Sequence, residues 1–386
     1  MNKKQKVIVS LLKEIDEICR QNNIMYYLSP RLTLCAVTEQ PFPQNPLFGV
    51  VLMKVEDMER FRRLIEEDPR EKRALESMKS HKWFPGFYLR YENTDTICIN
   101  LDRTRDYEYP GIGVNILPLR TSSVSGTAKS RISRAENGWT QLCDINQTES
   151  GYKNRINRTL MRLQCLINGR QRQAARLYER FCREFQGEGA EQYILRRRKQ
   201  TLTFPAEIFA GTKTVTLEGE EFQVPAGTEE YLTICYGNNY REIQEARYVI
   251  PSSMIVSARV SYAQFWKEEG NYEKYCKERR KNSRRLVKAR KYKKYFNECW
   301  KYVVLCGARM NLGIFYKSRK DYIMNLYKNE DYMALEKVFR PYYRMTEKSL
   351  QKGELFAEDV EIFDIYVDTL EKTGRTVQRS KISSLI

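Results

Sequence analysis

A short apolar run that leads directly into an acidic helix start is the feature that most constrains this chain. In FPQNPLFGVVLMKVEDMERF, a proline-rich turn precedes an apolar strand over Leu47 to Met53. Glu56 and Asp57 then open a helix, because carboxylates suit the positive N-terminal end of a helix dipole. Such a strand is where many α/β enzymes mount catalytic carboxylates. This strand carries no carboxylate. The sequence therefore predicts the strand and helix that would support an active site, without the catalytic carboxylates.

The segments around this strand alternate between helical and strand periods up to about residue 250. The predicted elements are a helix over 5–22, a strand in IMYYL, a helix in RLTLCAVTEQ, a β-hairpin in FYLRYENTDTICINLDR, a core strand in GIGVNILPLR that Pro118 stops, helices from Arg131 to Gln186, a hairpin around Gly219 and a helix that ends on Gly237. The helices carry an apolar stripe of Leu160, Leu163, Leu166 and Ile167, with arginines on the other faces. The pattern predicts an α+β core.

The chain beyond about Pro251 reads as helical and very basic throughout. We therefore predict a core over 1–250 and a basic helical region over 251–386 that packs on it. Within this region, residues 278–296 interleave Arg and Lys with Tyr292, Tyr295 and Phe296. Their spacing suits the buried side of a helix better than a surface for stacking bases, and no nucleic-acid motif accompanies them.

The net charge of +18 favours anionic partners without choosing among nucleic acid, anionic lipid and phosphorylated glycans or nucleotides. The ten cysteines include no CxxC pair, and the chain has a single histidine, His81, so a zinc site is disfavoured. No signal peptide is recognisable, and no apolar run approaches the roughly 18 residues of a membrane span. We expect a cytoplasmic protein with reduced, mostly buried thiols.

Three separated stretches resemble, in order, the LicD family, relatives of fukutin with a nucleotidyltransferase-like fold that transfer phosphorylcholine or similar phosphoalcohols onto glycans. The opening stretch up to Phe61 is similar to the family frame of a helix, a strand, GGTLLGAVRH and PWDDDIDIGM. Matching positions there are Leu32, Ala36, Val37, Phe42, Met53, Asp57 and Phe61. GVNILPLR at 113–120 and the block at 204–240 resemble two later family segments. The resemblance covers roughly residues 8–250 and implies a mixed sheet flanked by helices.

At the positions that carry the family's chemistry, this chain departs from the pattern. The resemblance places the two metal-binding Asp positions on Phe48 and Val50 and the third on Asn115. The glycine pair that lets a phosphate approach falls on Pro30 and Arg31, after Ser29. The acidic run before the metal ligands becomes Pro46 and Leu47. Phenylalanine and valine cannot ligate Mg²⁺, which requires oxygen ligands, so no cofactor is expected.

Three functions remain open at this stage. The first is a catalytically degenerate LicD-like partner or regulatory subunit beside an active LicD-like enzyme. The second is an active Mg²⁺-dependent phosphoalcohol transferase that uses relocated carboxylates, with Asp57, Asp102 and Asp106 as candidates, and acts on lipid-linked phosphoglycans. Either protein would lie in the cytoplasm or at the inner membrane face, on an anionic surface. The third is a basic nucleic-acid-binding protein, which the absence of any known motif disfavours.

Overall fold

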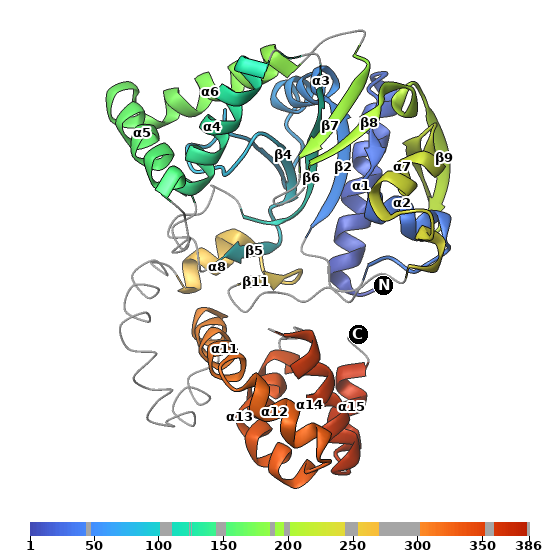
Figure 1. The fold of residues 1–386 in the computed structure, drawn as a ribbon, viewed down its shortest axis with the longest axis vertical. Helices are drawn as coiled ribbons and strands as arrows, with labels where there is room; N and C mark the ends of the chain where they lie inside the picture. The colour runs from blue at the N-terminus through green and yellow to red at the C-terminus, as the bar shows by residue number, and fades with distance from the viewer. Residues whose placement is uncertain are drawn as a thin grey trace.

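The computed structural model describes most of the chain, in several ranges. These are residues 1–43, 48–100, 110–122, 124, 126–143, 152–185, 190–196, 201–243, 254–269, 302–351 and 359–383. The fold is α+β, with a curled mixed sheet flanked by helices and a helical C-terminal region (Figure 1). The predicted fold class is confirmed.

The main sheet has seven strands within the described residues. They are β1 Tyr27–Leu28, β2 Gly49–Lys54, β3 Arg73–Glu76, β4 Leu89–Asn93, β6 Ile112–Thr121, β7 Gln192–Arg196 and β8 Thr201–Pro205. The order β1-β2-β6-β4-β3 continues from β6 through β7 to β8. β2 and β6 run parallel, and the other pairs are antiparallel. The sheet is therefore mixed, with β2 and β6 at its centre.

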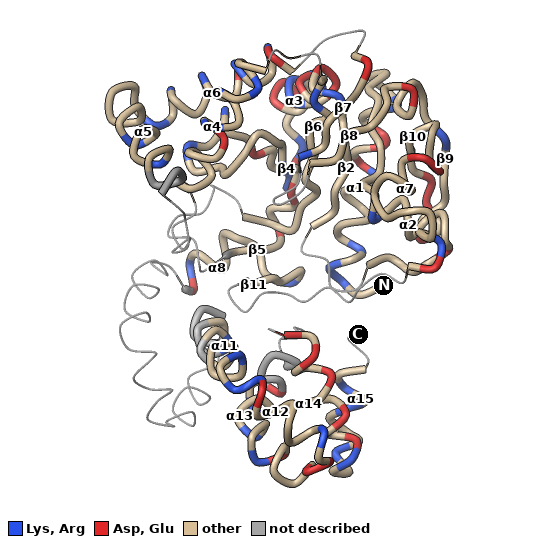
Figure 2. The backbone as a smooth tube through the Cα atoms, viewed as in Figure 1, with Lys and Arg blue, Asp and Glu red and all other residues tan. Residues whose placement is uncertain are grey.

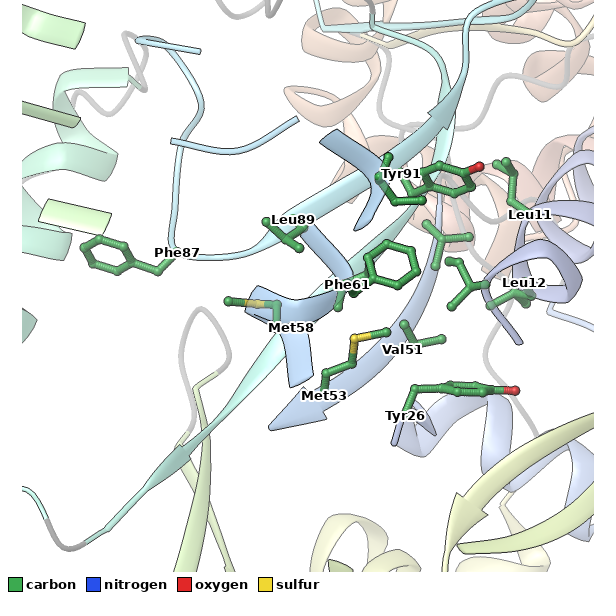
Figure 3. Close-up of a cluster of buried hydrophobic side chains, with 14 of the residues drawn as sticks. Leu11, Leu12, Tyr26, Val51, Met53, Met58, Phe61, Phe87, Leu89 and Tyr91 are labelled. Carbon is green, nitrogen blue, oxygen red and sulfur yellow. The ribbon is translucent and has the colours of Figure 1, made fainter. Parts of the chain in front are cut away.

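Helices cover both faces of this sheet. α1 Lys3–Gln21 and α3 Val55–Glu67 lie on one face and α7 Thr228–Tyr236 on the other, and α2 Pro30–Val37 contributes residues to the buried clusters of both faces. Apolar residues recur at helical spacing in α1, and Leu11 and Leu12 meet Val51 of β2 in a fully buried cluster (Figure 3). Met58 and Phe61 bring α3 into the same cluster (Figure 3). Strand β2, which leads into the acidic start of α3, is thus covered by helices on both faces of the sheet.

A further group of three helices lies beyond α3, at the outer edge of the molecule (Figure 1). It consists of α4 Gly126–Cys143, α5 Tyr152–Asn168 and α6 Arg170–Phe185. The indole of Trp139 in α4 donates to the carbonyl of Phe84 at 2.7 Å. Phe181 in α6 stacks on Phe87 with 4.6 Å between ring centres. α4 and α6 therefore hold this layer against the segment that leads into β4.

The prediction of a β-hairpin in FYLRYENTDTICINLDR is wrong. β4 has both edges occupied, by β3 and β6, so β5 Ile97–Asn100 cannot pair with it. β5 instead pairs with β11 Met254–Ser257 in a separate two-stranded sheet. The prediction that the chain is helical throughout beyond Pro251 is consequently wrong at β11.

The prediction that Pro118 stops its strand is wrong, because β6 continues to Thr121. β4 pairs with β6 up to Ile116, and β7 joins the same edge at Arg120. Pro118 falls in the gap between these two partners. A strand tolerates a residue without an N–H where its edge has no neighbour.

The later segments of the core follow the sequence pattern closely. β9 Thr212–Leu217 and β10 Glu220–Pro225 form the predicted hairpin, whose turn has positive φ at Glu218 and Gly219. α7 ends at Gly237, whose φ of 90° suits a residue without Cβ. Two short 3₁₀ helices, Ala206–Phe209 and Tyr240–Glu242, flank these elements.

The chain after β11 is helical in the described residues. Its helices are α8 Tyr262–Glu269, α11 Tyr302–Lys317, α12 Lys320–Lys328, α13 Tyr332–Gln351, α14 Val360–Lys372 and α15 Thr376–Ser383. Cys306 and Met310 of α11 pack with Ile97, Ile99 and Ile255 of the small sheet, which joins the C-terminal helices to the core. The basic segment 278–296 lies outside the described residues. No helix in the described ranges is both long enough and apolar enough to cross a membrane.

Candidate functional site

The strand register brings the sequence-predicted site positions side by side. Val50 on β2 is the direct partner of Asn115 on β6. The amide of Ser29, at the end of β1, donates to the carbonyl of Val50 at 3.2 Å. Side chains directly opposite one another on neighbouring strands point to the same face of a sheet. The prediction that Val50 and Asn115 lie on adjacent strands is confirmed.

The same register extends the line of residues across two more strands. Asn115 is opposite Arg90 on β4, and Arg90 is opposite Glu76 on β3. We call Ser29, Val50, Asn115, Arg90 and Glu76 the cross-strand row. Phe48, two residues before Val50, lies beside this row, with its ring centre 6.0 Å from the guanidinium carbon of Arg90. The row therefore joins the positions of the predicted site to a cation that the sequence reasoning did not single out.

The side chains in and beside the row do not fit a bound Mg²⁺. Phe48 and Val50 offer no ligand atom. The Oδ1 atom of Asn115 is buried and has no hydrogen-bond partner in the described structure, but this neutral oxygen is not grouped with carboxylates, since the carboxylate of the row, Glu76, lies two strands away beyond Arg90. Arg90 adds a permanent positive charge opposite Asn115, which opposes a second cation there. Among the described residues, no three or more His, Cys, Asp and Glu side chains are grouped to hold a metal ion.

Arg90 of the row forms a buried, hydrogen-bonded pair with Glu92. The Nε atom of Arg90 donates to Oε2 of Glu92 at 3.1 Å, and its NH2 group donates to the carbonyl of Gly111 at 2.8 Å. A Cβ on Gly113 would lie 3.2 Å from Nε of Arg90. Glycine at this position of β6 therefore leaves space for the pair. The two glycines of GIGVN were the one sequence signal for it.

The electrostatics of this pair are dominated by burial. Glu92 is completely buried, and its desolvation raises the pKa of its carboxyl to about 8, with Glu76 adding to the shift and Arg90 opposing it. The backbone N–H of Gly111 also donates to Glu92 at 2.8 Å. Near neutral pH the cluster therefore combines one guanidinium with a Glu92 carboxyl that is mostly protonated.

Asp57, a candidate for a relocated metal-binding carboxylate, lies away from the row. It sits in the first turn of α3, after β2 has ended, and its Oδ1 is 3.3 Å from NH1 of Arg60. Because a strand rises about 3.3 Å per residue, the run from Val50 to Lys54 alone spans about 13 Å. Burial raises the pKa of the Asp57 carboxyl, which lies in the first turn of α3. Asp102 and Asp106 lie outside the described residues.

The turn at Ser29–Pro30–Arg31 occupies the place of the glycine pair and opens α2. Ser29 is the N-cap residue, with φ −60° and ψ 158°, and its carbonyl accepts from the amide of Thr33 at 2.9 Å. Pro30 is buried at the first helical position, where its fixed φ suits a helix start. Proline has no N–H to offer an anion, and its ring and the Arg31 side chain occupy space that glycines leave open. The turn is built as a helix start, without the open backbone of a phosphate cradle.

The sequence was also compared with known proteins. No protein-family model matches it, and no curated protein does.

Proposed function

We propose that this chain is a LicD-like protein with a filled metal site. In this proposal it acts as a catalytically degenerate partner or regulatory subunit of an active LicD-like enzyme that decorates cell-surface glycans with phosphorylcholine or a similar phosphoalcohol. One observation carries it: Val50 and Asn115, two of the positions where the resemblance expects a metal-binding Asp, are direct partners on neighbouring strands, yet neither is a carboxylate. The site of action is the cytoplasm, at the inner membrane face.

The packing around the row supports a filled site. Clustered carboxylates without their metal repel one another. Here Phe48 instead packs against the buried cluster that contains Val51, and Val50 packs against the buried cluster on the other side of the sheet. Arg90 supplies a fixed cation in the same row. In this proposal the fold does not depend on a metal, as a subunit that works through contacts requires.

Thermal unfolding with millimolar Mg²⁺ or Mn²⁺ tests the proposal. We expect an unchanged melting temperature, because a ligand that binds only the folded state stabilises in proportion to RT ln(1 + [L]/Kd). We also expect no turnover of CDP-choline. A metal-dependent rise that disappears in Asp57→Ala or Asp102→Ala would instead mean that the metal site has moved to other carboxylates and would contradict the degenerate site.

Restoring the family's carboxylates gives a sharper version of this test. Phe48→Asp with Val50→Asp is expected to destabilise the fold by roughly 2–5 kcal/mol without metal, since two carboxyls enter an apolar region. Adding Asn115→Asp should make the melting temperature depend on Mg²⁺. The matched control is Phe48→Leu with Val50→Leu, which keeps the region apolar and should stay insensitive to metal. A triple variant that ignores Mg²⁺ would remove the assignment of these positions.

The partner in this proposal is tested by co-expression with a LicD-like transferase that retains its Asp-x-Asp pair. We expect the two chains to co-elute in size-exclusion chromatography and the rate of phosphoalcohol transfer to change. Separate elution together with an unchanged rate would contradict the role as a subunit.

A further inference from the structure

Helix α5 faces solvent with its apolar side. Ile156, Leu160, Leu163 and Ile167 follow one another at steps of four, three and four residues, which places them along one face of a helix. Leu166 borders this face. Leu166 and Ile167 are 81% and 82% exposed, and the other three are 41–53% exposed. The apolar stripe predicted from the sequence exists, but it points away from the core.

The opposite side of α5 contacts the protein through apolar and polar groups, with Met161 buried in the core cluster and Cys165 packed against it. Gln173 of α6 donates to Gln164 of α5 at 3.0 Å and accepts from Asn168 at 3.0 Å. A Cβ on Gly138 of α4 would lie 2.9 Å from the carbonyl oxygen of Asn157, so the backbones of α4 and α5 approach closely there. The helix is therefore anchored through Met161 and Cys165, through hydrogen bonds and through close backbone packing. Its apolar stripe is not needed for this anchoring.

The layer that presents the stripe is strongly cationic (Figure 2). The exposed basic residues of α4, α5 and α6 are Lys129, Arg131, Arg134, Arg162, Arg172, Arg176, Arg180 and Arg183. Among the described residues of these helices, Glu179 is the one exposed carboxylate, and Glu136 is held by Arg120 and Arg196. Any surface that covers the stripe must be both apolar and compatible with this positive charge.

We propose that α5 is a membrane-docking helix that lies flat in the interface of an anionic lipid bilayer. A helix with a leucine- and isoleucine-rich face and basic flanks buries its apolar side about 5–10 Å into the boundary between headgroups and acyl chains. Arg162 is exposed beside Leu166, where its long side chain can reach the phosphates. A second copy of this chain fits less well, because pairing two such layers brings like charges together. The proposal is independent of the proposed function, since docking requires no state of the metal site.

Co-flotation of the full chain with lipid vesicles tests this inference. We expect binding to vesicles of equal parts phosphatidylglycerol and phosphatidylcholine, weaker binding at high salt, and little binding to phosphatidylcholine alone. Leu166→Ser with Ile167→Ser should weaken binding to the anionic vesicles at least about tenfold. The matched control is Met333→Ser with Val377→Ser, which alters two exposed apolar residues of the C-terminal helices and should bind as the wild type does.

A fluorescence measurement locates the contact on α5 itself. Ile167→Trp should add a blue-shifted emission component with anionic vesicles, quenched by brominated lipid, beyond the wild-type signal. Binding by the Leu166/Ile167 variant equal to wild type would overturn the proposal. So would a loss of melting temperature as large as that of a core substitution, because the chain itself would then cover the stripe. Self-association that the variant abolishes would assign the stripe to a second copy, and failure to bind either vesicle would leave a protein partner in its place.

Discussion

A buried carboxyl beside the cross-strand row controls how stability depends on pH. Glu92 lies next to Arg90 under complete burial, and its pKa rises from the ordinary 4.5 to about 8. The folded state therefore binds a proton that the unfolded state releases in the range between these values. Stability contributed by this proton is present at low pH and is lost as pH rises toward 8.

Glu92→Gln is expected to remove this dependence. Between about pH 5 and about pH 8 the wild type should lose stability with a slope of up to about 1.4 kcal/mol per pH unit from this residue. The variant should show a flatter profile in urea unfolding over the same range, because an amide does not titrate. The exposed Glu67→Gln is the control and should reproduce the wild-type slope. Identical profiles for wild type and Glu92→Gln would show that Glu92 stays ionised in the fold.

The sequence predicted Val50 and Asn115 of the cross-strand row but not its charged member Arg90, and the reason is physical. Val50 and Asn115 were placed by a resemblance that fixes which strands are neighbours. In LRYEN the charged residues alternate with apolar ones, which is the pattern of a strand with one face in water. β4 instead pairs with β3 and β6 along its two edges. Its second face is also covered, because Arg90 and Glu92 are buried. Alternation alone cannot reveal this, because burial of the second face depends on distant segments.

At the scale of elements, the close approach of α4 and α5 gives a second prediction. Gly138→Ala places a methyl group 2.9 Å from the Asn157 carbonyl, a backbone atom that cannot rotate away, so the helices must separate. We expect a loss of about 1–3 kcal/mol in the free energy of unfolding. Gly126→Ala, at the open start of α4, has no atom within 4 Å of its new Cβ and should be neutral or slightly stabilising. Chemical denaturation of both variants measures the difference.

Helical spacing predicted α5 correctly but not the direction of its stripe. A period of 3.6 residues shows that apolar side chains share one face, and it does not show which neighbour covers that face. Here buried Met161, the hydrogen bonds of Gln173 and the close contact at Gly138 hold the other side of α5 against the protein. Equal losses of stability in the two glycine variants would mean that α4 and α5 are not in this close contact.

At the scale of the whole molecule, the strand β11 determines where the core ends. β5 pairs with β11, and Ile97 and Ile99 are fully buried with Ile255 and Phe265. The C-terminal helices add Cys306 and Met310 to the same cluster. The boundary predicted near residue 250 therefore cuts off one strand of a buried sheet. The change to a basic composition in the sequence therefore does not mark the end of the core.

Two fragments test this boundary directly. A fragment of residues 1–250 exposes Ile97 and Ile99, whereas one of residues 1–269 keeps them covered by β11 and α8. Since covering one large aliphatic side chain contributes about 1.5–3 kcal/mol, we expect the shorter fragment to be less stable by at least about 3 kcal/mol in urea unfolding. The full chain should be more stable than both, because Cys306 and Met310 cover the same cluster from α11. If the two fragments unfold at the same urea concentration, the core ends at 250 after all, and β11 belongs to the C-terminal helices that follow it.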